Sequence, residues 1–354
     1  MKKISLAGLA VLFITCLTIN HCLACTTFCL ISKHNILFGR NYDFSVGDGL
    51  IFINKRGVAK EATMQEGPNP VKWVSKFGSV TFNQFGRENP TGGMNEMGMV
   101  VEEMWLDETE YPKADSRPTI DTQQWIQYLL DTSATTAEAI KNAERVRILS
   151  EVKVHYLISD QTGRTAAIEF VKGKMVVHTG QTLTAPALAN DTYEKSIAYK
   201  RVKTRQEVSG DSSLDFFVRA ARKAEAFAKQ SRSSQEALSY AFAVLNNVSS
   251  SITQWSIVYD ITRRRIYFRT SHSPQIKSIE TKAFDYSCST AVTMLDIDTK
   301  ESGDVTGRFV NYARQANRDL IERSFAGTDF LASVSRTDRD SIASYPEVFT
   351  CTAP

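Results

Sequence analysis

The chain has 354 residues, of which 42% are hydrophobic and 23% are charged, and its formal net charge at pH 7 is +3. A chain of this length and composition can bury a sizeable hydrophobic core. Its nearly balanced charge gives no reason to expect a nucleic acid or an anionic membrane as a partner.

Residues 1–24 are typical of a secretory signal peptide, which is removed from the mature protein. Lys2 and Lys3 form a positively charged start, and an almost wholly apolar run follows over residues 6–19. This run is shorter than the about 20 residues that a membrane-spanning helix needs. We therefore predict an exported protein, periplasmic or secreted, with no stable membrane insertion and with a single domain over residues 25–354.

Cleavage directly before Cys25 would make a cysteine the first residue of the mature chain. The residue pattern predicts a strand over residues 25–31, then a polar turn, then a second extended stretch over residues 36–40. We expect these two strands to form a hairpin that brings Arg40 and Asp43 back towards Cys25.

Beyond this hairpin, blocks of strands alternate with helices. The expected strands span residues 50–54, 73–82, 99–105, 152–159, 165–170, 174–178, 255–260 and 265–270. The expected helices begin at the capping residues Asp121 and Thr135 and also span residues 212–229, 233–245 and 307–325. This order predicts an α+β fold in which helices cover a sheet or a sandwich of sheets.

An N-terminal cysteine carries a nucleophile and a base on the same residue. A free thiol has a pKa near 8.5 and is a weak nucleophile until it ionises. The α-amine titrates at about 7.7–8.0, so it can take the thiol proton, as the amine of an N-terminal threonine does for its own hydroxyl. In this scheme Arg40 stabilises the thiolate of Cys25 and Asp43 orients the α-amine.

Acyl transfer also needs hydrogen-bond donors for the oxyanion of the tetrahedral intermediate, and the loss of one donor costs about 3–4 kcal/mol. Asn95 follows two glycines and Asn190 lies in a loop after a strand, so both side-chain amides are candidates. Asn95 also fits an ordinary turn, and Asn190 also begins an Asn-x-Thr glycosylation acceptor. Phe44 and Trp105 are candidates for an acyl-binding pocket, although aromatic residues on strands are more often core.

The cysteines and histidines indicate no metal site and no cofactor, because the histidines are scattered and none is at short ligand spacing from a cysteine. Cys25 and Cys29 would lie about 13 Å apart on one strand, which is too far for a disulfide. Cys288 and Cys351 are the pair that we expect to be bonded in an exported protein.

Two further candidates are interpreted as structural. His155 lies within a strand pattern, which makes a papain-like Cys–His pair improbable. Glu102 and Glu103 are neighbours on an expected strand, so their side chains point to opposite faces and do not form a carboxylate dyad.

Three motifs follow the predicted cleavage site. They are Cys25-Thr26-Thr27-Phe28, Gly39-Arg40-Asn41-Tyr42-Asp43-Phe44 and Gly93-Met94-Asn95-Glu96-Met97-Gly98. Together they resemble the choloylglycine hydrolase family, which includes bile salt hydrolases and penicillin V acylases. The similarity continues through residues 188–191 and 255–260, so it covers most of the mature chain.

The resemblance implies the αββα four-layer sandwich of N-terminal-nucleophile hydrolases, often assembled as a homotetramer, and hydrolysis of linear amide C–N bonds. It assigns the nucleophile to Cys25, its support to Arg40 and Asp43, and the oxyanion donors to Asn95 and Asn190. The implied substrate is a small-molecule acyl amide, such as a conjugated bile salt, a phenoxyacetyl penicillin or an N-acyl homoserine lactone.

Two positions depart from the family pattern. Phe216 stands where the family often has an arginine that completes the site, and Arg219 lies one helical turn further on. Phe44 stands where the family often has a tryptophan. These differences concern the substrate and the level of activity more than the type of reaction.

Two alternatives stay open from the sequence alone. Leu23-Ala24-Cys25 resembles the end of a lipobox, and lipidation would consume the thiol and leave an envelope lipoprotein that only binds ligands. Cys22 occupies a position that is usually leucine in such signals, which argues against lipidation. In the other alternative, the acyl-enzyme passes its acyl group to a second amine instead of water, which would make the protein an acyltransferase.

Overall fold

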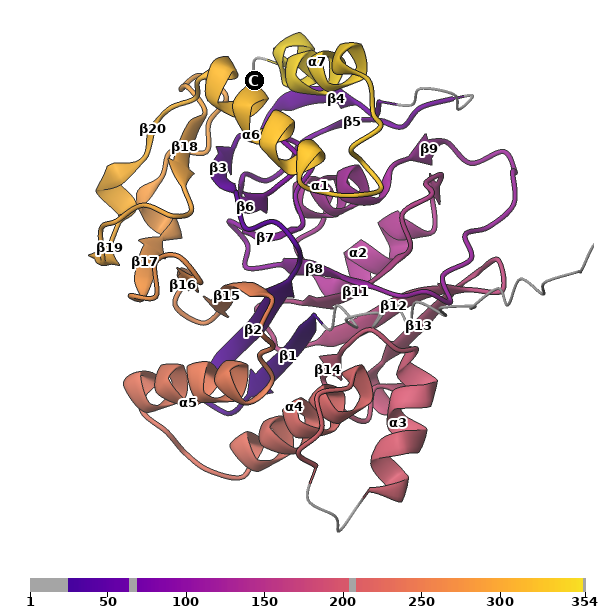
Figure 1. The fold of residues 1–354 in the computed structure, drawn as a ribbon, viewed down its shortest axis with the longest axis vertical. Helices are drawn as coiled ribbons and strands as arrows, with labels where there is room; N and C mark the ends of the chain where they lie inside the picture. Colours follow the sequence, from indigo (N-terminus) through magenta and orange to yellow (C-terminus); the bar gives the residue numbers. More distant parts are fainter. Residues whose placement is uncertain (1–24, 64–68, 204–207, 353–354) are drawn as a thin grey trace, which may run out of the picture.

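The computed structural model describes residues 25–63, 69–203 and 208–352, so the predicted signal peptide lies outside the described residues. Two large β-sheets organise this part of the chain (Figure 1). One sheet has seven strands and contains the N-terminal hairpin, and the other has nine strands.

The two sheets are built mainly from antiparallel neighbours. From edge to edge, the seven-stranded sheet contains β14 (Ala187–Leu188), β1 (Thr26–Ile31), β2 (Ile36–Asp43), β15 (Thr253–Asp260), β16 (Arg265–Thr270), β17 (Lys277–Glu280) and β19 (Gly303–Asp304). The nine-stranded sheet contains β13 (Lys174–Thr179), β12 (Thr165–Val171), β11 (Val154–Ser159), β8 (Val100–Trp105), β7 (Gly92–Asn95), β6 (Ser79–Asn83), β3 (Leu50–Asn54), β18 (Thr293–Asp296) and β20 (Val310–Asn311). Two small sheets pair β9 (Thr119–Ile120) with β10 (Arg147–Ile148), and β4 (Val58–Glu61) with both β5 (Lys72–Val74) and β21 (Thr350–Cys351).

Helices cover the outer faces of the two sheets. The α-helices in the described residues are α1 (Thr122–Thr132), α2 (Thr136–Ala143), α3 (Tyr193–Val202), α4 (Ser213–Ala228), α5 (Ser234–Asn247), α6 (Arg314–Ala326) and α7 (Arg336–Ser344). Helices α4 and α5 pack on β1, β2 and β15, whereas α1 packs on β7 and β8, and β1 meets β11 between the sheets. This helix–sheet–sheet–helix order confirms the predicted α+β, αββα sandwich.

Figure 1 shows α3, α4 and α5 together at the lower end of the view and α6 and α7 at the upper end. Helices α6 and α7 pack against each other. Among the helices in the described residues, none has the length and apolar character that a membrane crossing requires.

The alternation of side chains along the strands divides the core into layers. On β8, Val100 and Met104 belong to the cluster that surrounds the seven-stranded sheet, whereas Val101 belongs to the cluster under α1. In that second cluster Trp125 of α1 packs on Tyr156 of β11, with ring centroids 4.2 Å apart. The β8 strand therefore has a buried face on each side, as expected for a central strand of a covered sheet.

Capping hydrogen bonds confirm the predicted helix starts. The side chain of Asp121 accepts from a backbone N–H in the first turn of α1, and Thr135 and Ser233 do the same for α2 and α5. The sequence does not predict α3 and α7, because few of their residues are buried, Tyr193 and Ser196 in α3 and Ala343 in α7, and these leave no regular apolar stripe.

Three other elements differ in extent from the prediction. The expected strand over residues 73–82 is two strands, β5 and β6, separated by a bend. The expected helix over residues 307–325 begins only at Arg314, because Val310 pairs with Met294 in β20 and β18. The expected long loop after the hairpin contains β4 as well as β3.

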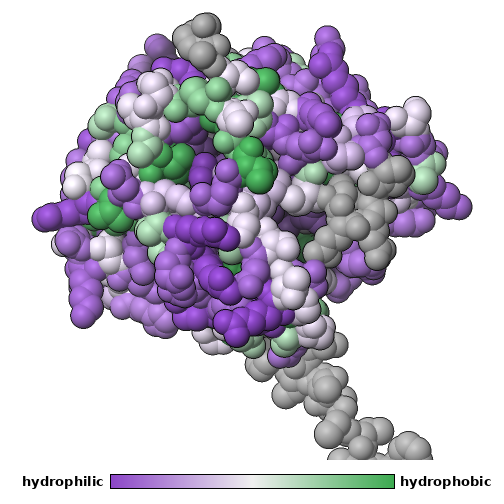
Figure 2. Space-filling view, turned by 90° about the horizontal axis from the view of Figure 1, so that it is seen from above, coloured by the Kyte–Doolittle hydropathy of each residue, from purple (hydrophilic) through white to green (hydrophobic). Residues whose placement is uncertain are grey.

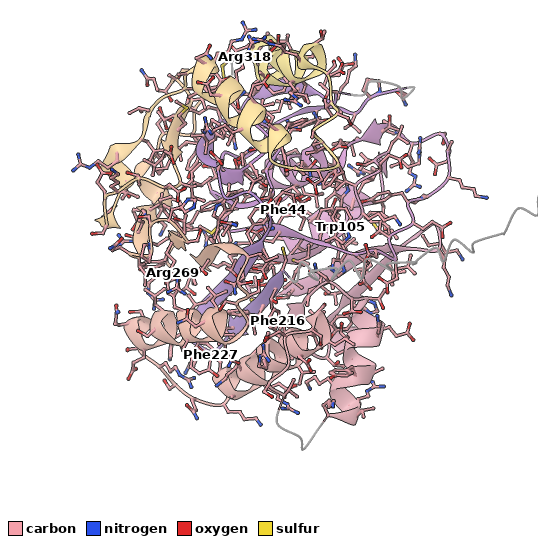
Figure 3. All side chains as sticks on the ribbon, viewed as in Figure 1. Phe44, Trp105, Phe216, Phe227, Arg269 and Arg318 are labelled. Atoms are coloured by element: carbon pink, nitrogen blue, oxygen red, sulfur yellow. A yellow bond between two sulfur atoms is a disulfide. The ribbon has the colours of Figure 1, made fainter. Side chains whose placement is uncertain are left out.

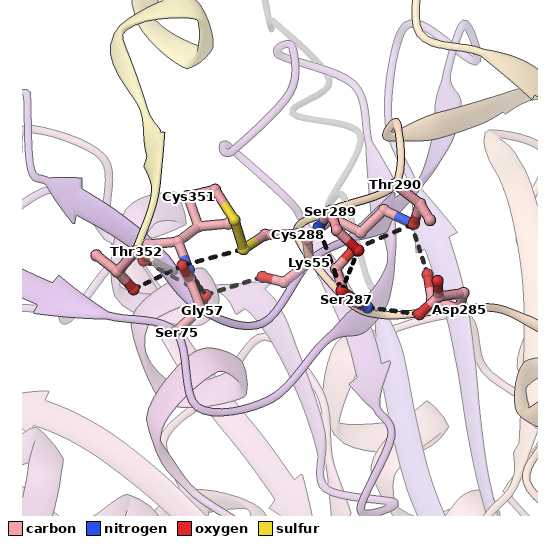
Figure 4. Close-up of a disulfide and its surroundings, with 11 residues drawn as sticks. Lys55, Gly57, Ser75, Asp285, Ser287, Cys288, Ser289, Thr290, Cys351 and Thr352 are labelled. Atoms are coloured by element: carbon pink, nitrogen blue, oxygen red, sulfur yellow. Dashed lines mark hydrogen bonds between the residues drawn. A yellow bond between two sulfur atoms is a disulfide. The ribbon is translucent and has the colours of Figure 1, made fainter. Parts of the chain in front are cut away.

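A disulfide fastens the C-terminal end of the chain. Cys288 and Cys351 are bonded, as predicted, with Cα atoms 5.5 Å apart (Figure 4). β21 pairs with β4, and Thr352 donates from its backbone N–H to the carbonyl oxygen of Gly57 at 2.8 Å. Cys25 is a free thiol, and the prediction that it does not bridge to its neighbour on the same strand is confirmed.

Removing this disulfide should destabilise the protein by several kcal/mol. Cys288 and Cys351 are 63 residues apart, and in the chain-entropy model a crosslink that closes such a loop stabilises the folded state by about 4 kcal/mol. We expect the double variant Cys288→Ser/Cys351→Ser to unfold at a clearly lower urea concentration than the unaltered protein. Reduction of the unaltered protein should give a similar shift, and an unchanged midpoint in both experiments would contradict the prediction.

Candidate active site

Cys25 lies directly before β1, opposite the end of β2. The hairpin register pairs Thr26 with Asn41, so Cys25 is placed next to the last residues of β2. The backbone N–H of Asp43 donates to Cys25 Sγ at 3.4 Å, and Sγ lies 3.6 Å from the Asp43 carbonyl oxygen. The predicted approach of Asp43 to Cys25 is therefore present, and the cysteine is buried, with 5% of its surface exposed.

Arg40 is a buried cation that acts on the thiol. Its Nη1 donates to the carbonyl oxygen of Thr91 at 2.9 Å and forms an ion pair with Glu102. Burial raises the pKa of the Cys25 thiol to about 11, and the charge of Arg40 is the strongest influence that lowers it. The thiol is therefore protonated at neutral pH in this environment, and it needs a base that takes its proton during attack.

Two hydroxyl groups hold the carboxylate of Asp43. Thr253 Oγ1 donates to Oδ1 at 2.6 Å, and Ser250 Oγ donates to Oδ2 at 2.9 Å. Burial raises the pKa of Asp43 to about 6, and the two hydrogen bonds oppose this shift. The group is thus mainly a carboxylate at neutral pH, which lets it accept a hydrogen bond from an amine. No sequence motif points to Ser250 or Thr253, because only the pairing of β15 with β2 brings them to Asp43.

Glu102 on β8 is a site residue that sequence reasoning missed. Its carboxylate accepts hydrogen bonds from Arg40 and from the hydroxyl of Tyr259. Gly92 on β7 makes room for it, because a Cβ at that position would lie 2.0 Å from Glu102 Oε2. A carboxylate on the inner face of a buried strand needs a cationic partner, and this requirement is the signal that could have linked Glu102 to Arg40.

Asn95 has a structural role instead of the predicted catalytic one. Its side-chain amide donates to the carbonyl oxygens of Leu130 and Ser133, both at 2.8 Å. Its side-chain oxygen accepts from the backbone N–H groups of Met97 and Met99, both at 3.0 Å. These bonds fasten the C-terminal end of α1 to the turn between β7 and β8. Both amide hydrogens are used, so the predicted oxyanion role of Asn95 is wrong for this structure.

Asn190 follows β14, the strand that pairs with β1 beside Cys25. β14 pairs with β1 in an antiparallel register that places Leu188 opposite Thr27, so the chain that leaves β14 runs towards Cys25. The backbone N–H of Asn190 donates to Ser213 Oγ at 2.7 Å, which ties the loop to the start of α4. The oxyanion role of its side chain stays a prediction.

His155 is structural, as predicted. Its Nδ1 lies 3.0 Å from Glu169 Oε1, and its Nε2 hydrogen-bonds to the carbonyl oxygen of Ala189 at 2.6 Å. Both ring nitrogens are therefore engaged away from the thiol. Among the described residues, no group of histidine, cysteine and carboxylate side chains is arranged to hold a metal ion.

The two aromatic residues predicted to contact an acyl group lie near the centre of the view in Figure 3. Phe44 directly follows Asp43, is half-buried, and stacks on Tyr42 with ring centroids 5.5 Å apart. Trp105 ends β8, is half-buried, and donates from its indole N–H to Asp107 Oδ1 at 2.6 Å. Neither ring is buried completely, so each has surface available for a ligand.

The position that the family often fills with arginine is apolar here. Phe216 is completely buried in α4. Arg219 packs on its ring, and the Arg219 guanidinium donates to the carbonyl oxygens of Val208 and Gly210 at 3.4 and 2.5 Å. Arg219 is therefore directed to the loop before α4 and does not replace the family arginine.

Comparison with known families decides the assignment. A family model described as linear amide C-N hydrolases, choloylglycine hydrolase family, matches residues 25–294. The chain belongs to the choloylglycine hydrolase family. As a member of this family it is a linear amide C–N hydrolase.

Relatives within the family include two enzyme types. The chain is 24% identical to the penicillin V acylase of Pectobacterium atrosepticum, over 81% of this chain and 90% of that protein. It is 25% identical to the bile salt hydrolase/transferase of Clostridium perfringens, over 72% of this chain and 92% of that protein.

Solved structures agree with the family assignment. The penicillin V acylase from Agrobacterium tumefaciens superposes with a TM-score of 0.72 at 28% identity, over 81% of this chain and 98% of that one. A mutant conjugated bile acid hydrolase from Clostridium perfringens superposes with a TM-score of 0.64 at 18% identity, over 82% of this chain and 99% of that one. The second likeness concerns the fold alone.

Proposed function

We propose that this hydrolase is exported and that cleavage after Ala24 leaves Cys25 as its N-terminal nucleophile. The observation that carries the proposal is the placement of Cys25 Sγ against Asp43, beside the charge of Arg40. The carboxylate of Asp43 is held by two hydroxyl groups, that of Glu102 is paired with Arg40, and both ring nitrogens of His155 are engaged elsewhere. We therefore assign the base to the α-amine that cleavage would create on Cys25 itself.

The proposed reaction proceeds through a thioester. The thiol proton of Cys25 moves to the α-amine as the bond between Sγ and the carbonyl carbon forms, and the Asn190 amide donates to the oxyanion. The C–N bond then breaks as the α-ammonium gives its proton to the leaving amine. Water adds to the thioester with the α-amine again as base, which releases the carboxylic acid and restores the thiol.

The proposed substrate is a small acyl amide with an apolar acyl group, of the bile salt, phenoxyacetyl penicillin or N-acyl homoserine lactone type. The names of the relatives support the first two types. The half-buried rings of Phe44 and Trp105 support an apolar acyl group.

Export is supported by the disulfide between Cys288 and Cys351, because structural disulfides persist mainly outside the reducing cytosol. An acyltransferase that uses the same thioester is the second candidate, favoured by the name of one relative as a bile salt hydrolase/transferase. Lipidation of Cys25 would abolish both activities, since it consumes the thiol and acylates the amine.

The direct test is the intact mass of the exported protein, measured before and after treatment with a thiol-alkylating reagent. We expect a chain that begins at Cys25, gains one alkyl group at that residue near pH 7 under native conditions, and loses amide hydrolysis with the same time course. A lipid-sized mass increase on Cys25, or a start at another residue, would refute the proposal. Added amine acceptors then separate the two activities, because an acyltransferase forms a new amide and a hydrolase releases only the acid.

A further inference from the structure

The C-terminal segment, residues 314–351, lies beyond the part of the chain that the family model matches, which ends at residue 294. It contains α6, α7 and β21, and the disulfide fastens its end. The end of the molecule that carries α6 and α7 is seen from above in Figure 2, where hydrophobic side chains lie among a mostly hydrophilic surface. Among the described residues of this segment, Phe330 and Val348 are large hydrophobic side chains that stay exposed.

The C-terminal segment contacts the loop that follows the catalytic hairpin. Ser45 Oγ donates to the carbonyl oxygen of Gly327 at 3.5 Å, and Arg323 Nε donates to Asp48 Oδ1 at 2.5 Å. Gly327 permits this approach, because a Cβ there would lie only 2.7 Å from a methyl group of Val46. The end of α6 is therefore held within a few residues of Asp43.

A series of aromatic contacts connects Phe44, which directly follows Asp43, to α6. Phe44 meets Phe85 edge to face with ring centroids 6.0 Å apart, and Phe85 meets Phe325 of α6 in the same way at 6.2 Å. Phe85 is half-buried and Phe325 is buried. These rings fix the position of the turn that follows α6.

Phe330 lies in that turn and reaches the other candidate pocket residue. Its ring centroid is 6.0 Å from that of Trp105, at the end of β8. Phe330 is 51% exposed, so about half of its surface is accessible beside the half-buried Trp105. Since the Trp105 indole N–H is bonded to Asp107, the two rings present apolar surface without a free polar group of their own.

We propose that Phe330, with Trp105, forms an aromatic wall that binds the acyl group of the substrate and makes the hydrolase prefer aromatic acyl groups. This inference rests on the proposed function of Cys25 and adds a specificity-determining residue that comes from outside the matched family region. Aromatic rings gain more from contact with a second aromatic ring than from contact with a small alkyl group. Both rings of the wall are apolar, so it suits an uncharged acyl group.

The test compares two amides of one chromogenic aromatic amine, the phenylacetyl amide and the acetyl amide. We expect Phe330→Ala to lower the ratio of their kcat/KM values about tenfold, because the loss falls on the phenylacetyl amide. Phe330→Tyr, which keeps the ring, should retain most of the preference. Phe349→Ala is the matched control, since that ring lies in the same segment but contacts Tyr345; it should leave the ratio unchanged.

Each other outcome would overturn the inference in a recognisable way. An unchanged ratio in Phe330→Ala would show that Phe330 does not bind the acyl group. An equal fall in Phe330→Ala and Phe349→Ala would assign the effect to general loosening of the C-terminal segment. If the unaltered enzyme cleaves neither amide and Cys25 is not alkylated, the proposed function itself fails and the inference falls with it.

Discussion

Replacing Cys25 with alanine should lower amide hydrolysis by at least about 10⁴-fold, because the reaction loses its nucleophile. The fold should be largely unaffected, since the contacts of Sγ with the backbone of Asp43 are long and weak. Cys25→Ser should be nearly as damaged, because a serine hydroxyl is much harder to ionise than a thiol. The measurement is steady-state release of the acid product, with circular dichroism as the check on folding.

Cys29 supplies the matched control for this experiment. It is also a free and buried cysteine, and its Sγ lies 3.5 Å from Ser159 Oγ. In the hairpin Cys29 lies opposite Phe38, away from the end of β2 that carries Asp43. Cys29→Ser should keep the chain start, the alkylation of Cys25 and most of the activity. Hydrolysis by Cys25→Ala at the rate of the unaltered protein, or equal losses in Cys25→Ala and Cys29→Ser, would contradict the nucleophilic role.

The second large effect should come from the buried pair of Arg40 and Glu102. Their side chains are 1% and 0% exposed, and Glu102 is the ion-pair partner that the described residues provide for Arg40. Burial raises the pKa of Glu102 to about 7, while Arg40 lowers it. The guanidinium of Arg40 keeps its proton in a protein, and its charge favours the ionised form of the Glu102 carboxyl beside it. We therefore take the ion pair as the dominant form. Glu102→Gln would therefore leave a buried charge without a partner.

We expect Glu102→Gln to lower the free energy of unfolding by about 3–5 kcal/mol and to reduce hydrolysis strongly, because Arg40 loses its position beside the thiol. Urea unfolding and kcat/KM measure the two effects separately. In the double variant Arg40→Met/Glu102→Leu, stability should recover in part, since neither member of the pair is left as an unpaired charge, whereas activity should not recover, since Arg40 is absent.

Glu103 is the control on the same strand. Burial raises its pKa to about 8, so this carboxyl is already largely protonated at neutral pH and Glu103→Gln should change stability little. A harmless Glu102→Gln would mean that Glu102 is also protonated and that Arg40 is balanced in another way. Recovery of activity in the double variant would show that Arg40 does not support the thiol.

The predicted site residues that the structure brings together share a local origin. Cys25, Arg40 and Asp43 lie in one hairpin, whose strands are apparent from short-range alternation and whose register follows from the connecting turn. The helix starts could also be predicted from the local sequence, because a cap is formed by residues within one turn. Bringing the loop that contains Asn190 towards Cys25 required one more step, the pairing of β14 with β1.

The failures have a different physical cause. Asn95 has the residue type and the glycine neighbours of an oxyanion donor, but its amide bonds to the end of α1, which is distant in sequence. Glu102 was recognised as turned away from Glu103, yet its partner Arg40 lies on a strand of the other sheet. The hydrogen-bond partners of a buried polar group are thus decided by which layers meet, and a local pattern cannot supply that.

The sequence by itself determined the layered α+β architecture, the N-terminal hairpin with Cys25, and the disulfide pair, because each leaves a periodic or local trace in the chain. Only the tertiary structure decided that Glu102 neutralises Arg40, that Asn95 is structural, and that Phe330 reaches Trp105 from the far end of the chain. These contacts join segments far apart in sequence, and their energies come from burial and charge pairing, which exist only once the two sheets and the C-terminal segment have packed together.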